Sequence, residues 1–330
     1  MNDPEVRERL AGLDVTVPNV ARIYDYILGG KDHFEADRVA AEQILAVIPG
    51  GSGPARMNRA FLGRVVEFLA AERGIRQFLD IGSGLPTASN VHEIAQQVRP
   101  DARVVYADND PVVVLHAQAI LADRANGVAA VRGDLRDPAG ITASPRVREL
   151  IDFSEPVAVL LFAVLQFVSD ADDPRVLLAR FRDVMAPGSA LALSHVTDDN
   201  LDEEVGRAGR AVYQGASVPM VPRSRERIEG FFAGLDLLPP GVVGIKHWPE
   251  PDPGGAAPLF YGGVAVKPAR LPASSARQDV GIQRAGRVQG GTDPGEEREL
   301  RLGARQREPA RFQGTDAVLR GDRAAERRDE

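Results

Sequence analysis

Hydrophobic and polar positions follow two alternating patterns along residues 77–267. Short apolar runs that are typical of buried parallel strands occur at 77–81, 103–107, 128–132, 156–167 and 189–195. Segments with the apolar spacing of helices separate them, at 91–98, 111–122 and 173–185. This alternation predicts a doubly wound, mostly parallel α/β sheet. Two further strand-like segments, 242–248 and 259–267, are expected to close the sheet as an antiparallel pair.

The segments on either side of this region have other patterns. From Pro18 to about Leu69 the spacing is helical, with breaks at Gly29-Gly30 and at 49–54. We therefore expect residues 1–69 to form an N-terminal helical cap and residues 70–267 to form the sheet domain. Residues 268–330 contain 13 Arg, no Lys and one aromatic residue. A segment with so little to bury is expected to be disordered.

Composition narrows the class of protein. The chain has 330 residues, of which 44% are hydrophobic and 26% charged, as in ordinary globular proteins. A net charge of −7 argues against binding nucleic acid by bulk electrostatics. The lack of cysteine excludes disulfides, thiolate zinc sites and a cysteine nucleophile. No apolar run reaches the roughly 18–20 residues of a membrane span. We expect a cytoplasmic protein without a metal site or a nucleic-acid or membrane partner, of unknown oligomeric state.

The most informative motif follows the first predicted strand. Asp80 ends the apolar run, and Gly82, Ser83 and Gly84 form a G-x-G turn that leads into a helix. Such a turn lets the backbone approach a nucleotide-like ligand. A dinucleotide fingerprint needs a third glycine, and Thr87 stands there instead. S-adenosylmethionine carries a sulfonium and an ammonium group and no phosphate. Because Asp80 can meet a cation, it favours this cofactor over NAD. A purely structural turn at a strand end is the alternative.

Two more acidic loops follow the next strands. Asp108, with Asn109 after it, ends the second strand, where an acid can accept hydrogen bonds from ribose hydroxyls. Asp134 follows the third strand and could accept from the adenine amino group, with Leu135 packed on the ring. The alternatives are a helix cap at Asp108 and a solvated turn at Asp134, and Asp110 is expected to cap the next helix. Three acidic loops at neighbouring strand ends together predict a cofactor site.

Candidates for catalysis lie in three other segments. Tyr24 and His33 flank a double glycine in a charged, aromatic stretch that forms either a lid over the cofactor or a solvated structural turn. His195 ends the fifth strand, where it is either a general base or a satisfied structural histidine. Phe162 and Gln166 follow the fourth strand, where cofactor and substrate often meet. Gln166 either orients a ligand or is a hydrogen-bonded core residue.

Several motifs are specific in combination. They read A-R-I-Y-D-Y-I-L-G-G-K-D-H-F at 21–34, M-N-R-A-F-L at 57–62, Q-F-L-D-I-G-S-G-L-P-T at 77–87, V-V-Y-A-D-N-D-P at 104–111 and L-S-H-V-T at 193–197. With them, residues 15–267 resemble an actinobacterial family of S-adenosylmethionine-dependent methyltransferases once catalogued as a domain of unknown function. The resemblance implies a Rossmann-like class I methyltransferase fold. It also implies that Asp80, Gly82, Gly84, Asp108 and Asp134 lie in the cofactor site.

The chain departs from this family at one informative position. The family usually has L-H-F where this chain has Leu165-Gln166-Phe167, so an acid–base role is not carried over to Gln166. The leading hypothesis is a methyltransferase that uses S-adenosylmethionine on a small-molecule acceptor, which the sequence does not identify. The alternative is a non-catalytic, regulatory protein that binds the same cofactor. An NAD-dependent oxidoreductase is disfavoured by the missing third glycine.

Overall fold

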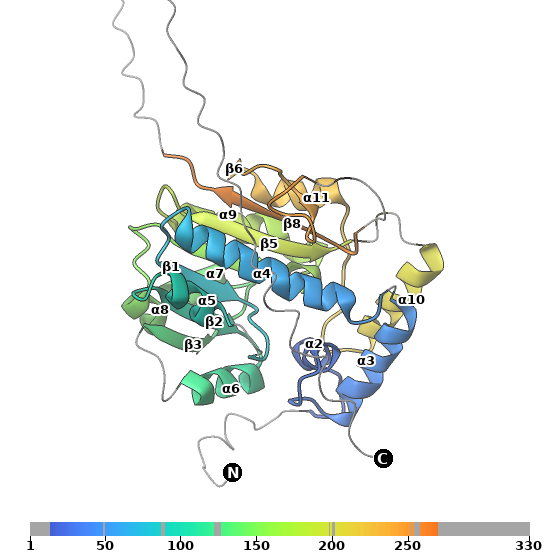
Figure 1. The fold of residues 1–330 in the computed structure, drawn as a ribbon. Helices are drawn as coiled ribbons and strands as arrows, with labels where there is room; N and C mark the ends of the chain where they lie inside the picture. The colour runs from blue at the N-terminus through green and yellow to red at the C-terminus, as the bar shows by residue number, and fades with distance from the viewer. Residues whose placement is uncertain are drawn as a thin grey trace, which may run out of the picture. The chain divides into compact units, whose positions relative to one another are not determined.

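A mixed sheet runs through the centre of the fold (Figure 1). The computed structural model describes residues 14–48, 50–86, 90–121, 127–197, 199, 202–251, 253 and 258–269. The predicted disordered tail therefore lies, but for 268 and 269, outside the described residues, and so does Thr87.

Five parallel strands in the order β3-β2-β1-β4-β5 make up most of the sheet. They are β1 (Gln77–Ile81), β2 (Arg103–Asp108), β3 (Val128–Arg132), β4 (Ala158–Phe162) and β5 (Ala190–Val196). β8 (Phe260–Val266) is antiparallel to β5, and the short strands β6 (Asp236–Leu237) and β7 (Val243–Gly244) pair with β8. The predicted doubly wound sheet with an antiparallel closing strand is confirmed. Its chain order reverses between β1 and β4, which is where such sheets bind ligands.

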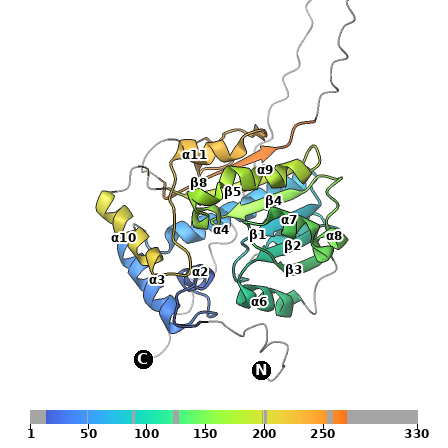
Figure 2. The same ribbon diagram turned by 180° about the vertical axis from the view of Figure 1, so that it is seen from behind.

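Helices cover both faces of the sheet because its strands are apolar on both sides. Phe78 of β1 packs with α4 (Gly53–Ala71), α5 (Val91–Val98) and α6 (Pro111–Leu121). Leu79, the next residue, faces the opposite layer. Figure 2, which shows the molecule from behind, has this layer in view. It contains α7 (Pro138–Ala143), α8 (Pro145–Leu150), α9 (Pro174–Val184) and α11 (Arg225–Glu229). No helix in the described part of the chain is long and apolar enough to cross a membrane.

A smaller helical group lies to one side of the sheet (Figure 1). It consists of α2 (Val20–Leu28), α3 (Glu35–Val47) and α10 (Glu203–Gln214), which we call the cap. Gly29 ends α2 in the left-handed conformation, at φ 87°. The cap has its own apolar cluster, in which Ile23 and Ala41 are fully buried. α4 instead buries Phe61 and Val65 against the sheet, and the division of the chain at residue 69 stays a prediction.

Several parts of the fold differ from the sequence prediction, which named no element for α7 and α8. The segment 242–248 forms a strand only at Val243–Gly244. Its remaining apolar residues pack on α4: the Trp248 ring lies 5.7 Å from Phe61 and 5.3 Å from Phe68, between centroids. Burial by a neighbouring helix therefore produced a strand-like pattern. No element was predicted for α10, whose exposed polar face leaves only Gly209 fully buried.

Gly262 of β8 determines how closely α4 approaches the sheet. A Cβ atom there would lie 2.4 Å from Cε1 of Phe61. We expect Gly262→Ala to lower the free energy of unfolding by about 1–3 kcal/mol through overpacking. Gly63→Ala in α4 is the matched control, because its Cβ would meet Ile94 at an ordinary 3.6 Å. Alanine is the better helix former, so this variant should gain up to about 1 kcal/mol. Urea unfolding of both variants would measure these changes in the free energy of unfolding. If both variants were stabilised, or both destabilised, the role given to Gly262 would be contradicted.

Candidate active site

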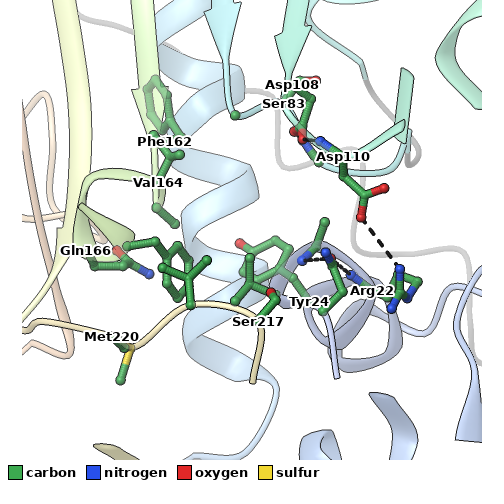
Figure 3. A pocket seen from close by; sticks show the side chains of 18 of the residues that line it. Arg22, Tyr24, Ser83, Asp108, Asp110, Phe162, Val164, Gln166, Ser217 and Met220 are labelled. Atoms are coloured by element: carbon green, nitrogen blue, oxygen red, sulfur yellow. Dashed lines mark hydrogen bonds and ion pairs between the residues drawn. The ribbon is translucent and has the colours of Figure 1, made fainter. Parts of the chain in front are cut away.

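A cavity of about 790 Å³ lies at the carboxyl ends of strands β1–β4, beneath the cap. Ligand pockets commonly measure about 300–1,000 Å³, so this one lies within the range of small-molecule sites. Figure 3 shows Asp108 and Asp110 on one wall and Phe162, Val164 and Gln166 on the opposite wall. Within the described residues, no group of three or more histidine or acidic side chains is placed to hold a metal ion.

The turn after β1 forms one edge of this cavity. Asp80, Gly82, Ser83 and Gly84 all line it. The two glycines have φ values of 67° and 66°, a conformation that side chains disfavour. A Cβ atom on Gly82 would also lie 2.3 Å from Cγ2 of Val164. Both constraints require glycine, which explains the G-x-G spacing in the sequence.

Asp80 is 5% exposed at the end of β1. Burial raises the pKa of this carboxyl to about 7, an effect that the charge of Arg59 opposes and that of Asp108 reinforces. The free protein therefore holds a proton on Asp80 at mildly acidic pH. A cationic ligand in the cavity would favour the ionised carboxylate.

Asp108 joins the first two strand ends. Its Oδ2 accepts a hydrogen bond from the backbone N–H of Gly84 at 3.0 Å, and its Oδ1 accepts from that of Asp110 at 2.9 Å. Burial raises the pKa of Asp108 to about 6, although these two hydrogen bonds oppose the shift. Asp110 caps α6 as predicted, since its Oδ1 accepts from the N–H of Val112 at 2.7 Å.

The third acidic loop also reaches the cavity. Asp134 and Leu135 line it, as does Asn109 from the end of β2. The Asp134 carboxylate accepts from Nη2 of Arg136 at 2.6 Å. Hydrogen bonds from Arg136 and from the Asn109 side chain lower the pKa of Asp134. This carboxylate is therefore ionised over the whole physiological range.

The fourth strand ends in a strained turn. Ala163 has φ 53°, which is uncommon for a residue other than glycine. Its N–H donates to both the carbonyl and the hydroxyl of Ser194, at 3.1 and 3.0 Å. The Ser194 hydroxyl donates in turn to Oδ1 of Asn58 at 2.6 Å, which ties the turn to α4. The turn places Phe162, Val164 and Gln166 on the cavity wall.

The three catalytic candidates lie in different surroundings. Tyr24 lines the cavity. Its hydroxyl donates to the Ala55 carbonyl at 3.1 Å and accepts from Nδ2 of Asn58 at 3.0 Å. Burial raises its pKa. His33 does not line the cavity, because its Nδ1 turns to Oδ2 of Asp25, 3.2 Å away. Of the predicted lid residues, Tyr24 is thus the one on the cavity wall.

His195 also lies outside the cavity lining. Its Nε2 is 2.9 Å from Nη1 of Arg223, which can only donate, so Nε2 accepts. Its Nδ1–H then donates to the Val196 carbonyl at 2.7 Å. Burial, with a smaller effect from the Arg223 charge, lowers the pKa of His195 to about 3. Both ring nitrogens are engaged and the ring is fully buried. The geometry therefore favours a structural histidine over a general base.

An ion pair between the cap and the sheet was not predicted from the sequence. Arg22 of α2 is 1% exposed, and its Nη1 lies 3.6 Å from Oδ2 of Asp110 (Figure 3). The Nε atom of Arg22 donates to Asp37 at 2.8 Å. Both Arg22 and Asp110 line the cavity. The available signal was an arginine within a segment, 20–28, that is otherwise mostly apolar and aromatic.

The sheet order and the acidic strand ends define the Rossmann-like fold of class I methyltransferases. The chain belongs to the S-adenosyl methyltransferase family, whose model matches residues 7–268. The family predicted from the sequence motifs is thereby confirmed, and the cofactor is S-adenosylmethionine.

Two solved structures from actinobacteria are similar to this chain over most of its length. A candidate methyltransferase from Thermobifida fusca is 42% identical, with a TM-score of 0.73, over 78% of this chain and 98% of that protein. A DUF574 family protein from Streptomyces avermitilis is also 42% identical, with a TM-score of 0.72, over 77% of this chain and 99% of that protein. No curated protein matches the chain.

The described residues fit S-adenosylmethionine. Asp80 and Asp108 are buried carboxylates that burial keeps partly protonated in the free protein. A ligand with two cationic groups and ribose hydroxyls would favour the ionised carboxylates and would offer them further hydrogen-bond donors.

We expect the affinity for S-adenosylmethionine to rise roughly tenfold from pH 5.5 to 7.5, because Asp80 and Asp108 ionise in this range. Asp80→Asn should weaken binding and remove most of the rise above pH 6. Asp134→Asn should leave the pH dependence intact, because the lowered pKa of Asp134 keeps it ionised throughout. Isothermal titration at a series of pH values measures this, and a flat wild-type profile would contradict it.

The same pKa shifts affect the stability of the free protein. Between about pH 4 and 7 the folded state retains protons on Asp80 and Asp108 that the unfolded state has lost. These two groups therefore lower the stability as the pH rises through this range, the reverse of an ordinary ion-paired aspartate.

The ion pair between Arg22 and Asp110 predicts a second effect. Asp110→Asn keeps a capping oxygen for α6 but removes the charge. A buried charge left wholly unpaired costs about 3–5 kcal/mol. Arg22 keeps its bond to Asp37, so we expect a smaller cost, with amide hydrogen exchange in Val20–Leu28 accelerated roughly tenfold. Glu35→Gln in the exposed pair with Arg38 is the control and should leave exchange in this helix unchanged. Unaltered exchange in Asp110→Asn would refute the idea that this ion pair holds α2 against the end of β2.

Proposed function

We propose that this protein transfers the methyl group of S-adenosylmethionine to a small-molecule acceptor bound beside β4 and β5. The observation that supports this most directly is the extent of the cavity. It is lined by the acidic ends of β1 and β2. It is also lined by Val164 and Gln166, after β4, and by Met220, which follows α10 in the sequence. A cavity that reaches both sets of residues provides room for an acceptor next to the cofactor.

The cofactor, when bound, supplies an electrophilic methyl group: the acceptor's lone pair forms the new bond to the methyl carbon while the bond to sulfur breaks and leaves its electron pair on sulfur. The protein's part is to hold the two reactants in line and to exclude water. We assign Asp80 to the cationic amino-acid end and Asp108 to the ribose. Asp134 and Leu135 would lie near the adenine.

The cap would close this site. Three side chains of the cap line the cavity: Tyr24 of α2, Ile44 of α3, and Ile48, which directly follows α3. We propose that these helices act as a lid, held down by the pair between Arg22 and Asp110. A lid with apolar side chains over the cavity keeps water from the methyl group.

Binding of S-adenosylhomocysteine tests the cofactor assignment. We expect Asp108→Ala to weaken it about ten- to a hundredfold, because hydrogen bonds to a charged group contribute roughly 1.5–3 kcal/mol. Asp101→Ala is the matched control, since Asp101 is 59% exposed and pairs with Arg76 away from the cavity. Isothermal titration measures both. No binding to the wild type, or equal binding by Asp108→Ala, would refute the assignment.

Methyl transfer itself needs a separate measurement. Incubation with methyl-tritiated S-adenosylmethionine and fractions of a metabolite extract should label an organic-soluble product of low molecular mass. Tight cofactor binding without any labelled product would instead favour a non-catalytic protein that binds the cofactor.

A further inference from the structure

The strand order divides the cavity into two halves. β2 and β3 lie on one side of β1, and β4 and β5 lie on the other. Neighbouring strands are about 4.8 Å apart, so the ends of β3 and β5 are separated by roughly 19 Å. The acidic loops occupy the β1–β3 half. We call the other part the acceptor half, and its wall includes Tyr24, Gln166, Phe167, Tyr213, Val218 and Met220.

Charge is distributed unevenly between these halves. The acidic residues at the ends of β1–β3, with Arg132 and Arg136, line the cofactor half. None of the six residues that define the acceptor half carries a formal charge. Asp14, Arg22 and Arg59 line the cavity as well, and the charge of Arg59 acts on Tyr24. An ionised acceptor against the other five residues would lose its hydration to uncharged side chains, which is costly. The acceptor half therefore suits an uncharged molecule.

Aromatic rings give this half its shape. Phe167 and Tyr213 are in contact, with ring centroids 5.7 Å apart and planes inclined at 50°. Tyr24 lines the same part of the cavity, and burial raises the pKa of both tyrosines, so their hydroxyls stay neutral. Offset and edge-on packing of aromatic rings is favourable in such a setting. A flat aromatic molecule fits this wall.

Gln166 supplies one polar group to this apolar wall. It is 5% exposed, and its Oε1 accepts from the N–H of Val196 at 3.2 Å. Among the described residues, none accepts a hydrogen bond from its Nε2, which is the atom that carries both donors. The backbone of Gln166 is also held, because its carbonyl accepts from the N–H of Val221 at 2.7 Å. The amide is thus fixed with its donors available to a ligand oxygen.

The described wall of the acceptor half contains no histidine, and His195 is sealed beneath it. The acceptor must therefore lose its proton without a strong base nearby. A phenol, with a pKa near 10 as in tyrosine, does so far more readily than an alkyl alcohol. Donation from a fixed amide would stabilise the negative charge that develops on the phenol oxygen.

We propose, resting on the methyltransferase function above, that the acceptor is a neutral aromatic molecule with a phenolic hydroxyl, whose oxygen accepts a hydrogen bond from Nε2 of Gln166. Gln166 is then the residue that selects and positions the acceptor. The phenol loses its proton to bulk water as it binds, and its oxygen then forms the bond to the methyl carbon while the carbon–sulfur bond breaks and leaves its electron pair on sulfur.

Three matched probes test the proposal in the presence of saturating S-adenosylhomocysteine. 2-Naphthol carries the hydroxyl, 2-methylnaphthalene has the same shape without it, and 2-naphthoate is charged. Isothermal titration should show 2-naphthol binding about two- to tenfold more tightly than 2-methylnaphthalene, the worth of one hydrogen bond. 2-Naphthoate should bind least. Tighter binding of 2-naphthoate, or no preference for 2-naphthol, would overturn the proposal.

Variants of Gln166 assign the preference to its amide. Gln166→Leu should abolish the preference for 2-naphthol. Because it also leaves the Val196 N–H unpaired, Gln166→Glu serves as a second variant that keeps the acceptor and loses the donor. Absorbance titration should show that bound 2-naphthol ionises at higher pH in both variants than in the wild type. Gln214→Leu, on the exposed side of α10, should change neither measurement.

Cofactor binding distinguishes failure of the proposed function from failure of the acceptor proposal. If the wild type does not bind S-adenosylhomocysteine, the proposed function fails. If it binds but does not prefer 2-naphthol, the phenol assignment fails. If 2-naphthol keeps its preference and its ionisation in Gln166→Leu and Gln166→Glu, the assignment to the Gln166 amide fails.

Discussion

One buried guanidinium joins the cap directly to the end of β2. Arg22 donates to Asp37 within the cap and reaches Asp110 at the end of β2. A charge buried this deeply is costly unless it is paired, so the cap is held where the carboxylates are. The N–H of Asp110 in turn donates to Asp108. The cap is thereby linked in two steps to the buried carboxylate of Asp108.

The cavity beneath the cap has a polar half and an apolar half. The character of each half follows from the residues at the ends of the strands that line it. β1 and β2 end in acids that are already buried in the free protein, which raises the pKa of Asp80 and Asp108. β4 ends in Phe162 and a strained turn at Ala163, followed by apolar residues and one amide. The first half suits a cation with hydroxyl groups. The second suits a neutral molecule.

Residues that suggest chemistry in the sequence can have a structural role in the fold. His195 stands at a strand end, where a general base is plausible, yet both its nitrogens are engaged by Arg223 and Val196. Trp248 ends a strand-like segment but packs on α4. In both cases partners distant in sequence decided the outcome. A pattern along the chain does not contain those partners.

The sequence by itself determined the alternation of strands and helices, the G-x-G turn and the acids at the ends of β1, β2 and β3, because these follow from local periodicity and backbone conformation. The family, too, was readable from its motifs. Only the tertiary structure decided that Arg22 reaches Asp110, that His195 is sealed from the cavity and that Gln166 turns a free donor toward it. Such contacts join elements far apart in the chain, and burial of charge and pairing of polar atoms are settled only where those elements meet.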